Sequence, residues 1–208
     1  YAYVRFGRWE EVLSEPKPDA VSPYPLAIWH YARALARAAR GELDQARAEL
    51  ARVEGARTDP AFETTLAGTA LAQNLDIAIQ EVRAEIAARA GDWDTAVAAA
   101  TRGVALQDAQ AYNEPESWHR PVRLVLGGIL VDAGRYADAE RVYREDLKRH
   151  PETGWALVGL LRSLQGQGKR DEARDVDARF RQAWSRADVV LTGSRITTWD
   201  GPVSAGSK

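Results

Sequence analysis

A glycine-centred repeat is the feature that most constrains the fold of this chain. Residues 121–187 contain two successive units, and each has two stretches of helical apolar periodicity joined by a short turn. The turn glycines Gly134 and Gly168 are separated by the same number of positions as Gly7 and Gly41. The period is about 34 residues, which predicts stacked helical hairpins and not a single globular core.

The residues around each turn resemble the tetratricopeptide repeat. After Gly134, Tyr136 and Ala139 occupy the positions that pack the second helix of such a repeat, and Pro151 closes the unit. The resemblance implies an all-α fold, a right-handed superhelical solenoid of helix–turn–helix repeats. It also implies that the first helix of each repeat lines a concave groove.

The spacing of the turn glycines predicts the domain organisation. We expect a solenoid over residues 1–187 with insertions near 58–73 and 111–120, where the turn glycines lie further apart than one repeat. Residues 188–208 lack a helical apolar stripe, so we expect a short extended or irregular cap followed by a flexible tail. The turn glycines are Gly7, Gly41, Gly91, Gly134 and Gly168.

Composition excludes several classes of protein. The net charge of −2 argues against a nucleic-acid partner, and the absence of Cys excludes disulfides and thiolate metal sites. No apolar run is long enough to predict membrane insertion.

Of 28 basic residues 24 are Arg, which is typical of a GC-rich bacterial gene. The chain has no Met and begins inside a repeat, so we expect the C-terminal repeat region of a larger bacterial protein.

The resemblance implies a non-catalytic interaction module that binds a protein or peptide segment in the concave groove. No catalytic motif is present and no cofactor is expected. The residues that hold a partner's C-terminal carboxylate in one class of these repeats are absent. The predicted groove positions and the inserted loop give the candidate ligand-binding residues Tyr31, Glu81, Glu85, Trp118, Arg123, Trp155 and Arg162.

Glu81 and Glu85 are the most informative of these residues. They lie one helical turn apart on one face, where two carboxylates repel each other unless a cation compensates. Arg123 of the next repeat could pair with Glu81; otherwise the groove would attract a ligand that carries Lys or Arg beside an apolar anchor. Trp155 is the aromatic residue best placed to be exposed as that anchor.

The insertion at 111–120 has two interpretations. Loops that interrupt a repeat array often carry its function. The alternative is a lid that packs Tyr112 and Trp118 onto the groove or an adjacent helix.

A second function class remains open. An exported ligand- or metal-binding protein, or an accessory domain of an enzyme, could form a site from His30, Glu81, Glu85 and His119. His30 and His119 are the only metal candidates of interest, but their spacing has no metal-site signature, so we expect no metal.

Overall fold

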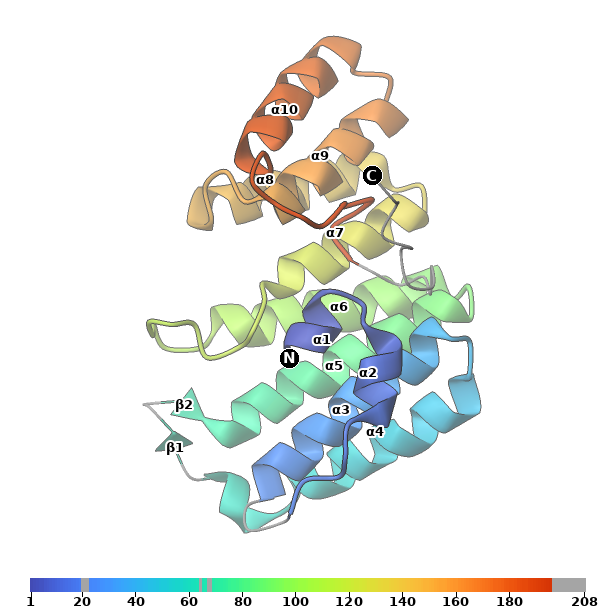
Figure 1. Cartoon of the computed structure of the whole chain (residues 1–208), viewed down its shortest axis with the longest axis vertical. Coiled ribbons are helices and arrows are strands. Elements are labelled where there is room, and N and C mark those ends of the chain that lie inside the picture. The colour runs from blue at the N-terminus through green and yellow to red at the C-terminus, as the bar shows by residue number, and fades with distance from the viewer. Residues whose placement is uncertain (20–22, 64, 67–68, 196–208) are drawn as a thin grey trace.

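The computed structural model describes residues 1–19, 23–63, 65–66 and 69–195 and is an array of helical hairpins (Figure 1). This confirms the prediction of an all-α helical repeat solenoid. The helices are α1 (Ala2–Arg5), α2 (Trp9–Ser14), α3 (Pro23–Ala39), α4 (Leu43–Arg57), α5 (Leu71–Arg89), α6 (Trp93–Asp108), α7 (Val122–Asp132), α8 (Tyr136–Arg149), α9 (Gly154–Gly166) and α10 (Arg170–Ala183).

Successive helices stack on one another from α3–α4 at one end of the molecule to α9–α10 at the other (Figure 1). Each helix packs on its neighbours in the sequence, and the first helices α3, α5, α7 and α9 also form a layer of their own. In the part of the chain that the structure describes, no helix is long and apolar enough to cross a membrane.

The five turn glycines all adopt a left-handed backbone conformation, with φ between 64° and 77°. At each turn the N–H after the glycine donates to a carbonyl oxygen of the preceding helical turn, at 2.8–3.0 Å. This is the Schellman geometry, which satisfies the last carbonyls of a helix and favours Gly because a Cβ is unfavourable at positive φ. This turn therefore explains why Gly recurs at the end of the first helix of each hairpin.

The insertion near 58–73 contains the only strands in the described residues. A 3₁₀ helix, η1 (Pro60–Glu63), is followed by the two short strands β1 (Thr65–Leu66) and β2 (Thr69–Ala70), which pair antiparallel. Phe62 of η1 is fully buried, so this insertion is packed on the solenoid.

The close packing of α7, α8 and α9 depends on two helical glycines. The ring of Tyr143 from α8 is fully buried between Gly127 of α7 and Gly159 of α9. A Cβ on Gly127 would lie 2.4 Å from Cζ of Tyr143, and a Cβ on Gly159 would lie 2.1 Å from the same atom. Side chains at these positions would therefore displace the tyrosine.

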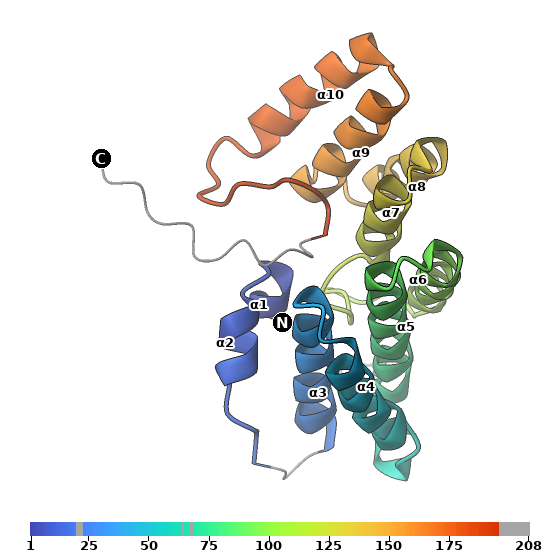
Figure 2. The same ribbon diagram turned by 90° about the vertical axis from the view of Figure 1, so that its right-hand side faces the viewer.

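The residues expected to form a cap and a tail are described only in part. Residues 188–195 are irregular and lie against the first helices, whereas 196–208, which include the rest of the predicted cap and the flexible tail, lie outside the described residues. The segment turns back after α10 toward α9 and α7 (Figures 1 and 2).

Replacing Gly159 by Ala should lower the free energy of unfolding by about 1–3 kcal/mol, because the new methyl group overpacks the Tyr143 site. Gly55 in α4 is the matched control, since a Cβ there meets no atom within 4 Å. Gly55→Ala should be neutral or stabilise the protein by up to about 1 kcal/mol. Denaturant unfolding followed by circular dichroism measures both values, and equal costs would contradict the packing of Tyr143.

Candidate functional site

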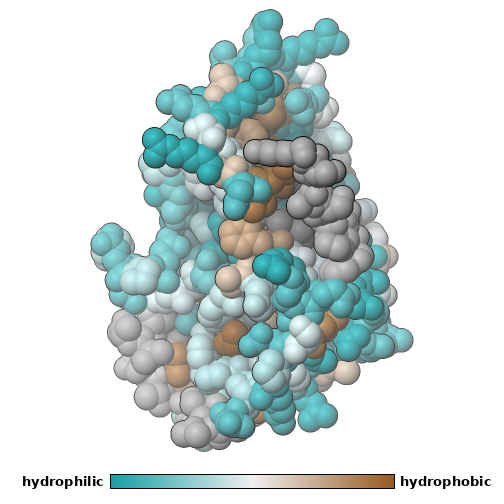
Figure 3. Space-filling model, in the orientation of Figure 1, coloured by the Kyte–Doolittle hydropathy of each residue, from teal (hydrophilic) through white to brown (hydrophobic). Residues whose placement is uncertain are grey.

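The predicted groove corresponds to the side of α3, α5, α7 and α9 that faces away from α4, α6 and α8, and we call this side the inner face. Three segments of the same chain lie on it (Figure 2). They are the N-terminal helices α1 and α2, the loop at 109–121 and the C-terminal segment 188–195. In the view of Figure 3 the surface is mostly hydrophilic, with a small apolar area in its middle.

A buried carboxylate, that of Glu81 on α5, lies at the centre of the inner face. Its Oε2 accepts hydrogen bonds from the hydroxyl of Tyr31 at 2.5 Å and from Nη2 of Arg120 at 3.1 Å. Its Oε1 accepts from the indole N–H of Trp118 at 3.2 Å. The side chain of Glu81 is 0% exposed, so this carboxylate depends on these three donors in place of water.

The burial and charge of this cluster shift the pKa of its members. Burial alone would lower the pKa of Arg120. The negative charge of Glu81 outweighs burial, so the pKa of Arg120 is raised. Burial, together with the charge of Glu81, raises the pKa of the Tyr31 hydroxyl. His119, whose Nε2 lies 3.1 Å from that hydroxyl, has its pKa lowered to about 2, by burial first and by Arg120 second. His119 is therefore neutral at physiological pH.

The prediction that Arg123 pairs with Glu81 is wrong. Arg123 forms a two-point ion pair with Asp108 of α6, at 2.6 and 2.5 Å, and the partner of Glu81 is Arg120. Arg123 belongs to α7 and lies beside α6, whereas Arg120 ends the inserted loop and is carried onto the inner face by it. The path of that loop is not encoded in the repeat pattern.

The inserted loop packs onto the helices through one of its two aromatic residues. Trp118 is 1% exposed and hydrogen-bonded to Glu81, so it is not a free aromatic anchor. Tyr112 is 86% exposed and does not pack on the groove. The lid interpretation therefore describes Trp118 and not Tyr112.

A second acidic site, formed by the buried Glu85 of α5 and the more accessible Asp132 of α7, binds the C-terminal segment. Arg195 donates from Nη1 to Glu85 and from Nη2 to Asp132, the latter at 2.7 Å. The side chain of Arg195 is 7% exposed. Burial opposes its charge, but Glu85 and Asp132 outweigh that effect and raise the pKa of Arg195.

Residues next to Arg195 add neutral contacts. The Oγ of Ser194 donates to the carbonyl oxygen of Leu124 at 2.7 Å and lies 2.5 Å from the hydroxyl of Tyr143. Gly128 of α7 permits this approach, because a Cβ there would lie 2.8 Å from the Cδ of Arg195. Leu191 is buried in the C-terminal hydrophobic cluster, which is formed by apolar residues of α5 to α10.

Trp155, expected to be exposed, is buried by residues from both ends of the chain. The guanidinium of Arg5 lies 4.6 Å from the centre of its ring, and the rings of Phe6 and Trp184 lie 6.1 and 6.0 Å away. The prediction that Trp155 is exposed is wrong, because α1 and the end of α10 cover this position of the groove. Arg162, by contrast, keeps 44% of its side chain exposed and lies 3.8 Å from Asp132.

The residues of the alternative metal or ligand site do not form one cluster. The Nδ1 of His30 lies 2.6 Å from Glu49 of α4, whereas His119 stacks on Tyr1 and contacts Tyr31. Among the residues that the structure describes, no group of three or more potential metal ligands is arranged to hold an ion.

Sequence reasoning did not identify the two arginines that neutralise the inner face. Arg120 and Arg195 lie outside the repeat units, so the positions of groove residues within a repeat do not predict a role for either arginine. The available signal was electrostatic, since Glu81 and Glu85 on one helix face required a cation from somewhere.

These hairpins define the chain as a helical repeat protein. A sequence model of the tetratricopeptide repeat matches residues 78–102, which span much of α5 and α6, and residues 121–145, which span α7 and most of α8. The chain therefore contains tetratricopeptide repeats in these two hairpins. Such repeats indicate a family of protein-interaction modules that is generally non-catalytic. Neither the curated proteins nor the solved structures give a match to this chain.

Replacing Arg120 by Ala should lower the free energy of unfolding by about 3–5 kcal/mol, because it leaves the buried Glu81 carboxylate without its cation. Replacing Arg123 by Ala should cost about 1 kcal/mol or less, because that pair lies near the surface. Asp108 also keeps Arg149 as a partner at 2.8 Å in this variant. Equal costs in denaturant unfolding would show that Arg120 is not the essential partner.

Proposed function

We propose that this chain is a non-catalytic interaction module that binds a short segment of a partner protein on its inner face. The segment carries an Arg that lies between Glu85 and Asp132, and an apolar residue a few positions before it. It takes the place that residues 188–195 of the chain itself occupy. The repeat family supports the general role, and the site supports the ligand chemistry.

The observation that carries the proposal is the docking of Arg195. One guanidinium is held by two carboxylates from different helices, Glu85 and Asp132, a geometry that suits the several N–H donors of Arg better than the single ammonium of Lys. Both carboxylates belong to the repeat array and the ligand arginine does not. An arginine from another protein would meet the same two acceptors.

The apolar part of the ligand is represented by Leu191. It is 7% exposed, packs in the C-terminal hydrophobic cluster and precedes Arg195 by a few positions. Between them Ser194 satisfies the carbonyl oxygen of Leu124 with its side chain. The preferred partner segment therefore combines a buried aliphatic residue, a small polar residue and an arginine.

The chain's own segment competes with any partner. A tethered segment has an effective concentration of the order of millimolar, so a partner must exceed its affinity or add contacts outside the site. Loss of Arg195 should therefore expose the carboxylates and increase binding of a partner segment.

A fluorescent peptide of sequence DVVLTGSR, equal to residues 188–195, tests this function by anisotropy with the full chain. We expect the peptide to bind Arg195→Ala about tenfold or more tightly than the unaltered chain. In this variant the chain's own segment has lost its arginine and competes less well for the site. Binding should weaken as salt rises above about 0.15 M, where the Debye length is about 8 Å.

Adding Glu85→Gln to the Arg195→Ala variant should weaken peptide binding by about tenfold or more, because the buried one of the two acceptors loses its charge. Glu145→Gln is the matched control, since Glu145 is a half-exposed α8 residue paired with Lys148. Equal peptide affinity with and without Glu85→Gln, or equal affinity of a peptide ending in Ala, would contradict the proposal.

A further inference from the structure

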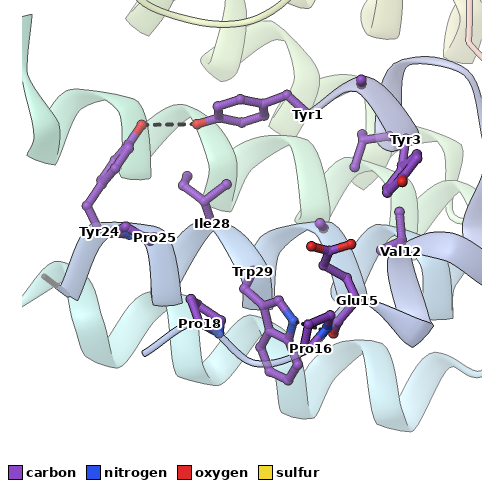
Figure 4. Close-up of a pocket in the computed structure, with 13 residues that line it drawn as sticks. Tyr1, Tyr3, Val12, Glu15, Pro16, Pro18, Tyr24, Pro25, Ile28 and Trp29 are labelled. Atoms are coloured by element: carbon purple, nitrogen blue, oxygen red, sulfur yellow. Dashed lines mark hydrogen bonds between the residues drawn. The ribbon is translucent and has the colours of Figure 1, made fainter. Parts of the chain in front are cut away.

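A second possible binding site lies away from the carboxylates of the inner face. It is a pocket of about 530 Å³ between the N-terminal helices α1–α2 and helix α3 (Figure 4). A volume of this size is typical of sites for small molecules. Its floor and walls are mainly apolar and aromatic, and include Tyr1, Tyr3, Val12, Tyr24, Ile28 and Trp29.

The aromatic side chains close the pocket on two sides. The hydroxyls of Tyr1 and Tyr24 meet at 3.1 Å and join α1 to the start of α3 (Figure 4). On another side, the indole N–H of Trp29 donates to the backbone carbonyl of Glu15 at 3.0 Å. That bond fixes the ring against the connector that follows α2. The walls are thus held by contacts between elements that are distant in the sequence.

Glu15 is the only side chain among the lining residues that is charged at neutral pH. Figure 4 shows its carboxylate on the pocket side, between Trp29 and Val12. Within the described ranges this carboxylate has no ion-pair partner. The pocket therefore combines an apolar lining with one negative charge.

The cations nearest to these rings are committed elsewhere. Arg33 lies 4.4 Å from the centre of the Trp29 ring, but it is bound to Glu49 and to the carbonyl oxygen of Leu13. Arg8 lies 5.5 Å from the centre of the Tyr3 ring and pairs with Glu11. Neither arginine is bonded to the carboxylate that lines the pocket.

We propose that this pocket binds a small organic amine with an aromatic body. The ring packs among Ile28, Val12 and the tyrosines, and the ammonium group pairs with the carboxylate of Glu15. A carboxylate ligand would be repelled by Glu15. A neutral ligand would displace water from Glu15 without a compensating charge, which would weaken its binding.

Three probes of similar shape test the proposal against the full chain by calorimetry and saturation-transfer NMR. They are phenethylamine, 3-phenylpropanoate and 2-phenylethanol, which differ in charge. We expect phenethylamine to bind about threefold or more tightly than either of the others, because it alone carries a cation that can pair with the exposed Glu15. Failure of all three to bind, or equal binding of the amine and the acid, would overturn the proposal.

Two variants locate the site. Glu15→Gln should weaken the binding of phenethylamine about threefold or more. Glu10→Gln of α2 should not weaken it, because Glu10 pairs with Arg40 and does not line the pocket. Ile28→Phe should abolish binding by filling the pocket. An unchanged amine affinity in Glu15→Gln would also overturn the proposal. Glu15→Gln should leave binding of the DVVLTGSR peptide unchanged, so the two sites are tested separately.

Discussion

Two carboxylates one helical turn apart on α5 determine how the rest of the chain covers the inner face. Glu81 and Glu85 are both buried, and a buried carboxylate is costly unless a cation and further donors replace its water. Glu81 takes Arg120 from the inserted loop, and Glu85 takes Arg195 from the C-terminal segment. The two segments that interrupt or follow the repeats are therefore attached to the solenoid by the same kind of interaction.

The sequence predicts the array well because its determinants are local. One glycine at positive φ in every repeat defines where each hairpin turns. A longer spacing between these glycines indicates an insertion. The repulsion between Glu81 and Glu85 is also visible in the sequence, since residues one helical turn apart share a helix face. The electrostatic requirement was predictable from these two residues.

The partners that meet this requirement were not predictable. Arg195 is far from Glu85 in the sequence, and Arg120 lies in a loop outside the repeat register, so no spacing rule connects either to its carboxylate. The predicted exposure of Trp155 failed for the same reason, because Arg5 and Phe6 reach it from the other end of the chain. In a repeat protein the repeats are encoded locally, whereas the segments that cover them depend on the whole fold.

Coverage of the inner face by the chain itself changes how the binding role is understood. The groove is a set of acceptors and apolar contacts that already hold one irregular segment, and not an empty channel. The small residues of α7 and α9 permit this: Gly128 admits Arg195, and Gly159 leaves room for the Tyr143 ring whose hydroxyl meets Ser194. Under the proposed function, a partner would exchange its own arginine-bearing segment for that of the chain.

The central claim is that residues 188–195 are docked on the inner face by Arg195. The most direct test attaches spin labels to the double variant Val190→Cys/Asp94→Cys and measures the distance between the two labels. Both side chains are exposed, and the chain has no other Cys. The account predicts a single narrow distance distribution that broadens in Arg195→Ala. A broad distribution in the chain that retains Arg195 would contradict it.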